Sequence, residues 1–194
     1  GAFYNFQKLE EVVLPEGLKA IKASAFFSCY RLKKINVPKT LRTIASDVFI
    51  ATKIESFSLR RVKKIGNMCF LDSKIKEVYL SKDCRSSSLV FWECENLKKV
   101  TLEDGIKKIS YGMFCDTALK TIDIPGSVFQ IGEDAFADCK KLQKVTLHEG
   151  IKKVGKNAFY NTSLKEITIP STVMELGKNA FRRESTEKSS LKKV

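Results

Sequence analysis

Six cysteines and one histidine are the side chains of this chain that could support redox, metal or nucleophilic chemistry. The cysteines are Cys29, Cys69, Cys84, Cys94, Cys115 and Cys139. An even number of cysteines can form a disulfide framework, and thiolates also bind zinc or act as nucleophiles. No two of them form a Cys-x-x-Cys pair, the spacing typical of zinc and redox motifs. Their positions in the fold must decide between these chemistries.

His148 is the only histidine of the chain. Ser-His and Cys-His catalysis both need an imidazole base, and one histidine leaves little material for these or for a histidine-dependent metal site. His148 follows Leu147 in a predicted turn, so we expect a solvated side chain. The sequence has no phosphate-binding glycine loop and no carboxylate pair that stands out. It therefore predicts a protein that is not an enzyme and uses no cofactor and no metal.

Basic residues give the chain a strong charge imbalance. The sequence has 35 Lys and Arg against 22 Asp and Glu, a formal net charge of +13. Such an excess could attract nucleic acid, anionic glycans or acidic membranes. Most of it is lysine, however, which commonly serves solubility, whereas specific phosphate recognition prefers arginine forks. Both interpretations stay open on composition alone.

A fixed repeat determines where all of these residues lie. Nine of the 13 phenylalanines recur every 21 to 23 residues, at Phe3, Phe26, Phe49, Phe70, Phe91, Phe114, Phe136, Phe159 and Phe181. This period predicts a solenoid, in which each coil buries its apolar side chains only against its neighbours. We expect one domain over residues 1–194 with eight to nine repeats and a last strand beginning at residue 191. Because the chain opens in mid-repeat without Met, we expect a piece of a longer protein.

Each repeat has two apolar groups and one glycine-containing segment. After each Phe comes an apolar triplet, as in Leu119, Ile122 and Ile124, whose alternation predicts a short strand with one buried face. A second apolar pair follows, as in Val128 and Ile131, and we assign it to the loops of the opposite side. The Gly-x-x-Ala-Phe segment before the next ring predicts one helical or 3₁₀ turn.

The unit L-x-x-I-x-I-P-x-x-V-x-x-I-G-x-x-A-F-x-x-C resembles the BspA-type class of leucine-rich repeats, and residues 167–181 fit it closely. The resemblance covers essentially the whole chain. It implies an α/β leucine-rich repeat solenoid, with short parallel β-strands on one face and short helical or 3₁₀ turns and loops on the other. It also implies a cell-surface or secreted protein of bacteria or protozoa that acts in adhesion or host contact. This piece contains no signal peptide and no apolar run long enough to insert into a membrane.

The repeat places Cys94 and Cys139 in one column, two coils apart. At roughly 4.8 Å per coil their separation is about 10 Å, whereas a disulfide needs Cα atoms within about 7 Å. Cys69 takes the slot that Ala135 and Ala158 fill in later repeats, which predicts a buried thiol. We therefore interpret the cysteines as small buried groups and not as disulfides or metal ligands.

The outward residues of the predicted strands form the first candidate binding surface. In a parallel sheet, the residues that flank the middle apolar position align from coil to coil. The candidates are Lys34, Asn36, Glu77, Tyr79, Lys99, Thr101, Asp123 and Lys144. This surface is polar and mixed in charge, which suits a protein or glycan ligand, including one on a host surface. An ordinary solvated sheet face would have the same composition.

A basic stripe forms the second candidate surface, because lysine and arginine recur inside the second apolar pair. The stripe comprises Lys19, Arg42, Lys63, Lys107, Lys108, Lys152 and Lys153. Repulsion between lysines about 5 Å apart in water costs under ~1 kcal/mol, so the stripe needs no function to be tolerated. The alternative is a scaffold for a polyanion, either a sulfated glycan or a nucleic acid. An intracellular protein-interaction scaffold is a third hypothesis, which unpaired thiols would permit.

One coil departs from the repeat. The polar segment 84–88 replaces its second apolar pair, so we expect a bend or exposed polar backbone there. Trp92 follows and shares a column with apolar residues of earlier coils. The column contains Tyr4, Phe27, Ile50, Leu71 and Trp92. It predicts an apolar contact ridge, although a degenerate repeat without a ligand is the other interpretation. The sequence predicts no oligomeric state.

Overall fold

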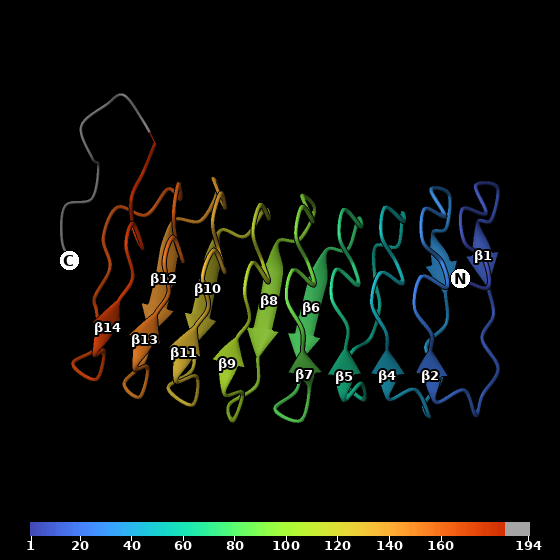
Figure 1. Cartoon of the computed structure of the whole chain (residues 1–194), viewed down its shortest axis with the longest axis horizontal. Helices are drawn as coiled ribbons and strands as arrows, with labels where there is room; N and C mark the ends of the chain where they lie inside the picture. Colours follow the sequence, from blue (N-terminus) through green and yellow to red (C-terminus); the bar gives the residue numbers. More distant parts are fainter. Residues whose placement is uncertain (185–194) are drawn as a thin grey trace.

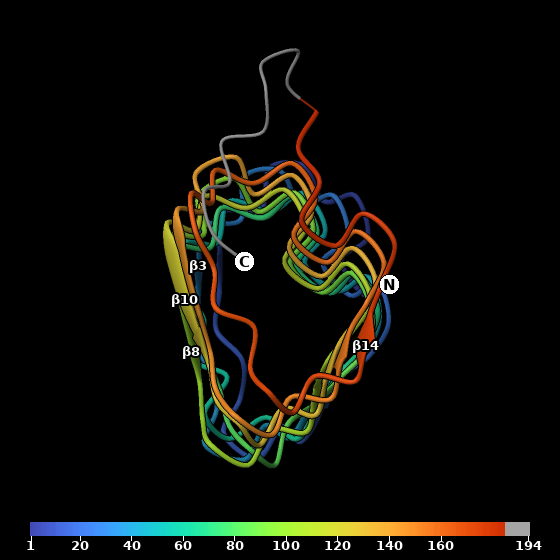
Figure 2. The ribbon, with the colours of Figure 1, turned by 90° about the vertical axis from the view of Figure 1, so that its left-hand side faces the viewer.

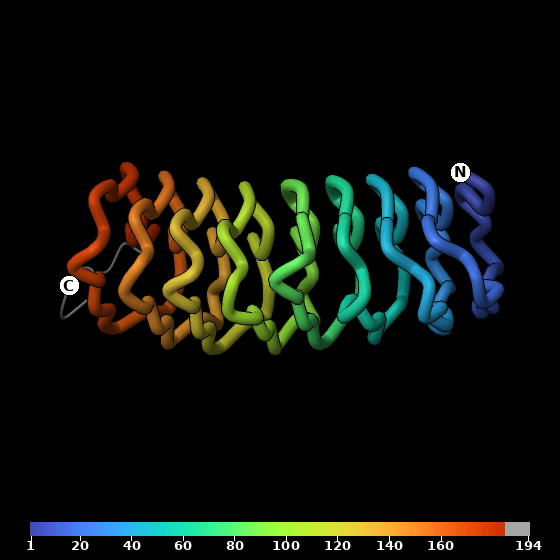
Figure 3. Tube along the Cα trace, turned by 90° about the horizontal axis from the view of Figure 1, so that it is seen from below, coloured from blue at the N-terminus to red at the C-terminus, as the bar shows by residue number. Residues whose placement is uncertain are grey.

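The computed structural model describes residues 1–184, and the strand expected from residue 191 lies outside them. The chain winds into coils that stack along one nearly straight axis (Figure 1). Each coil runs along one flank, turns, and returns along the opposite flank, which gives the closed outline of the end view (Figure 2). The same regular stacking is visible from below (Figure 3). The predicted solenoid is confirmed.

Both flanks carry short strands, and we call them the first face and the second face. The first face contains β1 (Glu11–Val12), β3 (Lys34–Ile35), β6 (Glu77–Leu80), β8 (Lys99–Leu102), β10 (Thr121–Ile124) and β12 (Lys144–Leu147). The second face contains β2 (Ala20–Ile21), β4 (Thr43–Ile44), β5 (Lys64–Ile65), β7 (Arg85–Ser86), β9 (Lys108–Ile109), β11 (Gln130–Ile131), β13 (Lys153–Val154) and β14 (Glu175–Leu176). All hydrogen-bonded strand pairs are parallel.

The second face corrects the sequence prediction, which assigned its residues to loops. Along both of its sheets, the backbone amides donate to carbonyls of the preceding coil, as Lys63 N does to Arg42 O at 2.8 Å. The apolar pair of the repeat points inward, and Ile44 and Ile65 are completely buried. A parallel ladder therefore satisfies the backbone where a loop would leave it unpaired. The fold is a parallel β-solenoid with two sheet faces.

The recurring phenylalanines form one continuous stack, as predicted. From Phe3 to Phe181 each ring lies on the next, with centroids 5.1 to 5.6 Å apart and interplanar angles of 1 to 27°. These distances lie just above the spacing of parallel strands, about 4.8 Å, so the ladders on both faces hold the rings in contact. The middle rings, such as Phe114, are fully buried.

The turns around the rings are not helical, and the described residues contain no α-helix and no 3₁₀ turn. The prediction of helical turns, and with it the α/β class, is therefore not confirmed. Two residues before and after Phe136, the φ angles of Asp134 and Asp138 are 53° and 56°. Left-handed residues on both sides of the ring interrupt any right-handed helical turn.

The glycine of the Gly-x-x-Ala-Phe segment serves close contact between coils. A Cβ atom at Gly155 would lie 2.6 Å from Glu133 N, and one at Gly177 would lie 2.3 Å from Lys156 N. Both distances are shorter than real Cβ atoms tolerate, so any larger residue would push the coils apart. The sequence suggested close approach at this segment, and the structure shows which backbone atoms make it necessary.

Candidate binding surfaces

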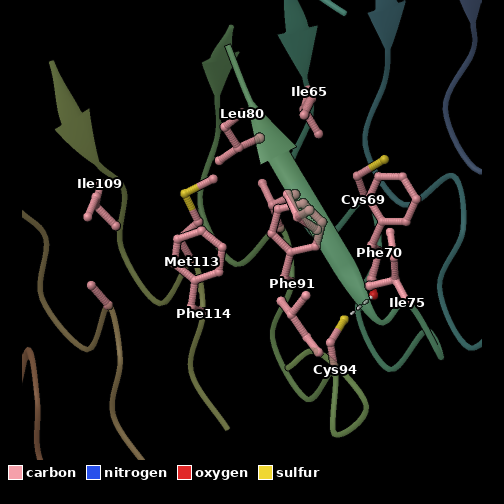
Figure 4. Packing of buried hydrophobic residues seen from close by; sticks show 14 of the residues in the cluster. Ile65, Cys69, Phe70, Ile75, Leu80, Phe91, Cys94, Ile109, Met113 and Phe114 are labelled. Carbon is pink, nitrogen blue, oxygen red and sulfur yellow. Dashed lines mark hydrogen bonds between the residues drawn. The ribbon is translucent and has the colours of Figure 1, made fainter. Parts of the chain in front are cut away.

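Four cysteines lie in the core, as predicted. Cys29, Cys69, Cys94 and Cys139 have no exposed surface. The Sγ atom of Cys94 donates to Phe70 O at 3.0 Å (Figure 4), and that of Cys139 donates to Phe114 O at 3.1 Å. Burial raises the pKa of Cys94 to about 12 and the pKa of Cys139 to about 11. These thiols are neutral at physiological pH and lack the thiolate that nucleophilic chemistry requires.

Cys84 and Cys115 are half-buried. Burial raises the pKa of Cys84 to about 11 and that of Cys115 to about 12. An activated cysteine has a lowered pKa, usually beside a cation or a helix N-terminus, so the direction is opposite to that of a catalytic thiol. Neither cysteine therefore has the lowered pKa of an activated thiol.

His148 is exposed, as predicted, but it has a partner that the sequence did not reveal. Its Nε2 atom lies 2.7 Å from Asp123 Oδ1, so the pair joins two neighbouring coils at the end of the first face. Over residues 1–184, no cluster of three or more His, Cys, Asp or Glu side chains could hold a metal ion. Asp123 was expected to face a ligand, and here it also binds within the chain.

No helix in the described part of the chain has the length and apolarity needed to cross a bilayer.

The first face brings the predicted columns into register. Glu77 pairs with Lys99 and Tyr79 with Thr101 along β6 and β8, while Thr121 pairs with Lys144 along β10 and β12. Opposite charges alternate along the outer column: Lys34 Nζ lies 3.7 Å from Glu11, and Lys99 Nζ lies 3.5 Å from Glu77. These exposed pairs each contribute under ~1 kcal/mol, but they neutralise the first face.

Tyr79 is the aromatic centre of the first face. The guanidinium carbon of Arg60 lies 4.1 Å from the centroid of its ring, a cation–π contact. Partial desolvation and the hydrogen bond to Glu103 raise the pKa of Tyr79. A shallow hollow of about 320 Å³ between the strands is lined by Tyr79, Arg60 and Lys99 among others. The face therefore offers an aromatic ring, a cation and hydroxyl groups in one place.

Two further first-face candidates have different surroundings. Asn36 exchanges two hydrogen bonds with the backbone of Leu14, so its amide serves contact between coils. Lys144 lies at a larger hollow of about 780 Å³ between β12 and residues 165–168. This hollow is open and shallow, and it suits contact with an extended partner better than enclosure of a small molecule.

The predicted basic stripe lies on the second face. Lys108 and Lys153 are in β9 and β13, and the other members directly precede a strand. Register places Arg85 beside Lys64 in the same column, although the irregular segment 84–88 had concealed it from the sequence pattern. Within residues 1–184, the strands of this face contain a single acidic residue, Glu175, which pairs with Lys153. The charge imbalance of the chain is therefore pronounced on the second face.

The predicted apolar column is also present. Asp72 N donates to Trp92 O at 3.0 Å and Ala51 N donates to Leu71 O at 2.9 Å, so successive members lie in successive coils. The rings of Tyr4 and Phe27 stack with centroids 4.9 Å apart. Phe27 and Trp92 are half-buried, which leaves part of each ring on the surface. A role of this ridge in contacts with another chain stays a prediction.

Comparison with known proteins identifies related chains. A family model described as BspA type leucine-rich repeat region matches six copies, over residues 1–88 and 87–188. A leucine-rich repeat protein from Bacteroides ovatus is 29% identical with a TM-score of 0.84, and the match covers 91% of this chain and 47% of that one. None of the curated proteins matches this chain.

Two more solved structures share the architecture. The leucine-rich repeat protein of T. pallidum is 25% identical with a TM-score of 0.61, and the match covers 73% of this chain and 68% of that one. The pneumococcal vaccine antigen PcpA is 15% identical with a TM-score of 0.57, covering 89% and 69%, and this likeness shows the fold alone. The chain spans about half the length of the Bacteroides protein.

Proposed function

Because the chain belongs to the BspA-type leucine-rich repeat family, we propose that it is a non-catalytic binding module of a cell-surface or secreted protein. The similar solved structures include bacterial leucine-rich repeat proteins, and one protein with the same fold is a vaccine antigen. As the chain spans half of its Bacteroides relative, the proposal includes that it works as part of a longer binding protein. Stacked coils supply an extended surface for such contacts.

The proposed ligand is a protein or glycan that lies along the first face. The observation that carries this proposal is the alignment of side chains around Tyr79. There β6 and β8 place a half-buried aromatic ring beside exposed Thr101 and beside the ion pair of Glu77 and Lys99. Aromatic rings with neighbouring polar groups are the usual anchors of binding surfaces. The hollows there are open and shallow, so affinity must come from many modest contacts over several coils.

Protein and glycan arrays test the proposal with two matched variants. The first-face variant combines Tyr79→Ala with Thr101→Ala, and the control combines Phe129→Ala with Lys152→Ala, two exposed residues of the second face. We expect the first-face variant to lose about tenfold or more in affinity for the ligand found, since truncation of an anchor costs over ~1 kcal/mol. We expect the control to bind like the original chain. A ligand that the first-face variant retains and the control loses would contradict the proposal.

The second candidate function is binding of a polyanion along the second face. The observation in its favour is the row of cations at Lys63, Lys64 and Arg85, none of which forms an ion pair within residues 1–184. Polyanion binding would fall steeply as salt rises, because bound cations release counterions from the polymer. Binding at the first face would depend on salt much less.

A further inference from the structure

The ladder of the second face is interrupted between β7 and β9, which belong to separate sheets. At an intact junction, Lys152 N and Lys153 N both donate to Phe129 O, at 2.9 and 3.1 Å. Within residues 1–184, the corresponding amides of Lys107 and Lys108 have no hydrogen-bond acceptor. The interruption leaves two backbone donors free at one place on the basic face.

Side chains explain the interruption. Cys84 takes the place of Val62, since its amide donates to Ser81 O in the turn as Val62 N donates to Leu59 O, and Ser86 aligns with Ile65. A half-buried thiol and a hydroxyl thus replace the inward apolar pair that seats a strand. Side-chain bonds still cross the junction, as from Ser110 Oγ to Ser86 O at 3.0 Å and from Ser86 Oγ to Met113 Sδ at 3.6 Å. The coils therefore stay adjacent while their backbones separate on this face. The sequence led us to expect a bend or exposed polar backbone in the coil of residues 84–88, but the amides of Arg85 and Ser87 donate to Lys63 O and Ile65 O, and the free amides belong to the next coil.

A hollow of about 500 Å³ lies at the interruption, within the size range of small-molecule sites. Its charged lining consists of Lys82, Arg85, Lys107 and Lys108 against one carboxylate, Asp83. None of these five side chains forms an ion pair in the described part of the chain. Four cations and two free amide donors thus converge on one hollow, an arrangement that favours an oxyanion.

We propose that this hollow binds a sulfate group of a sulfated saccharide. The lining contains no aromatic ring, whereas sites for single-stranded nucleic acid stack bases on aromatic side chains. Three of the four cations are lysines, which act as point charges and do not require the flat geometry that arginine forks recognise. The proposal deepens the second candidate function, polyanion binding along the second face. Binding of a longer sulfated polymer rests on that function, whereas the hollow can bind a sulfated disaccharide by itself.

Two double variants with the same loss of charge test the proposal. Lys107→Gln with Lys108→Gln alters the hollow, and Lys152→Gln with Lys153→Gln alters an intact junction. Both pairs follow an isoleucine, at Ile106 and Ile151. Titration calorimetry with a disulfated disaccharide at low salt should show binding that weakens on the order of tenfold in the first variant, since hydrogen bonds to charged groups are lost. The second variant should stay within about twofold, and the unsulfated disaccharide should not bind.

Three outcomes would overturn the proposal. Equal weakening in both variants would show only general attraction to a basic face. Tighter binding of an oligothymidylate of the same charge would assign the hollow to nucleic acid. Absence of disaccharide binding, with a long sulfated polymer bound equally by both variants, would remove the hollow as a site and leave the second candidate function standing. The unfolding curves of both variants should match the curve of the original chain, which shows that the binding comparison is made between folded proteins.

Discussion

The hydroxyl of Ser86 donates a hydrogen bond to Met113 Sδ at 3.6 Å, across two neighbouring coils. Ser86 holds the inward position that Ile65 and Ile109 hold in the coils on either side, and it leaves volume unfilled. Met113 occupies the slot that Ala135 fills in the next coil, and its side chain is buried among the core residues near this position (Figure 4). The longer side chain offsets the shorter one, which keeps the core continuous where the second-face ladder is broken.

Replacement of both partners should therefore be non-additive. We expect Met113→Ala alone to lower the free energy of unfolding by roughly 2 to 5 kcal/mol, because it leaves a cavity. Ser86→Ile alone should cost about 1 to 3 kcal/mol through overpacking against Met113. The combination should recover at least ~0.5 kcal/mol relative to the sum, measured by urea unfolding. Strict additivity would mean that the two side chains do not share a space.

Removal of one ring from the middle of the phenylalanine stack should destabilise the whole chain. Phe114 lies between Phe91 and Phe136 at 5.6 and 5.4 Å, so Phe114→Ala should cost roughly 3 to 5 kcal/mol. Phe129 is exposed and outside the stack, and Phe129→Ala should change stability by under ~0.5 kcal/mol. Thermal unfolding of both variants checks the difference, and similar losses would count against the stack as the core.

Relief of left-handed backbone strain should stabilise the protein. Met68 has a φ of 50°, at a turn position that Asp47 and Asn157 occupy in other coils. Asparagine tolerates this conformation better than methionine, so Met68→Asn should raise the free energy of unfolding by roughly 0.5 to 1 kcal/mol. Met68→Ala, which keeps the strain, serves as the control. If alanine stabilises as much as asparagine in chemical unfolding, the gain does not come from φ.

Thiol burial should make stability fall at high pH. In the fold the pKa of Cys94 is about 12, above its ordinary value of 9.0, so its neutral form is favoured. This contribution is fully present below about pH 9 and is lost as the pH rises toward 12, where the unfolded thiol ionises first. Cys94→Ala should flatten the fall in unfolding free energy over that range, and an unchanged slope would contradict the burial of a neutral thiol.

Slow labelling gives an independent check on the cysteines. Cys84 and Cys115 are half-buried with pKa values raised to about 11 and about 12, so few thiolates exist at pH 7. We expect a thiol reagent to label the native chain slowly at pH 7 and faster toward pH 11, while denaturant exposes every cysteine at once. Rapid labelling of the native chain at pH 7 would show a thiol that the fold does not protect.

The sequence predicted the parts of the fold that one clear period reveals. The recurrence of Phe114 and its equivalents predicted the stack, and the alanine-like slot of Cys69 predicted a buried thiol. The second face was missed because Val128 and Ile131 are three residues apart and its strands are two residues long, so no alternation of period two was visible. The predicted helical turns are not confirmed, because Asp134 and its equivalents adopt positive φ. The recurrence of Asp and Asn at that position could have indicated this conformation.

The candidate surfaces were predictable only as columns. The outward positions of Tyr79 and Lys99 followed from strand alternation, and the structure confirms their register. Contacts between coils were not predictable, because the bond between His148 and Asp123 joins residues 25 positions apart. The interrupted junction was visible as a departure from the repeat, but the free donors at Lys107 and Lys108 depend on backbone geometry that no residue pattern encodes.

Amide hydrogen exchange tests most directly whether the coils share a continuous core while the ladder of the second face is interrupted between β7 and β9. Lys107 and Lys108 share their immediate sequence context with Lys152 and Lys153, since an isoleucine precedes each pair. The structure predicts that the amides of 107 and 108 exchange at nearly unprotected rates, while those of 152 and 153 are slowed by on the order of tenfold or more through their bonds to Phe129 O. Equal protection at both pairs would contradict the interruption and the binding site inferred from it.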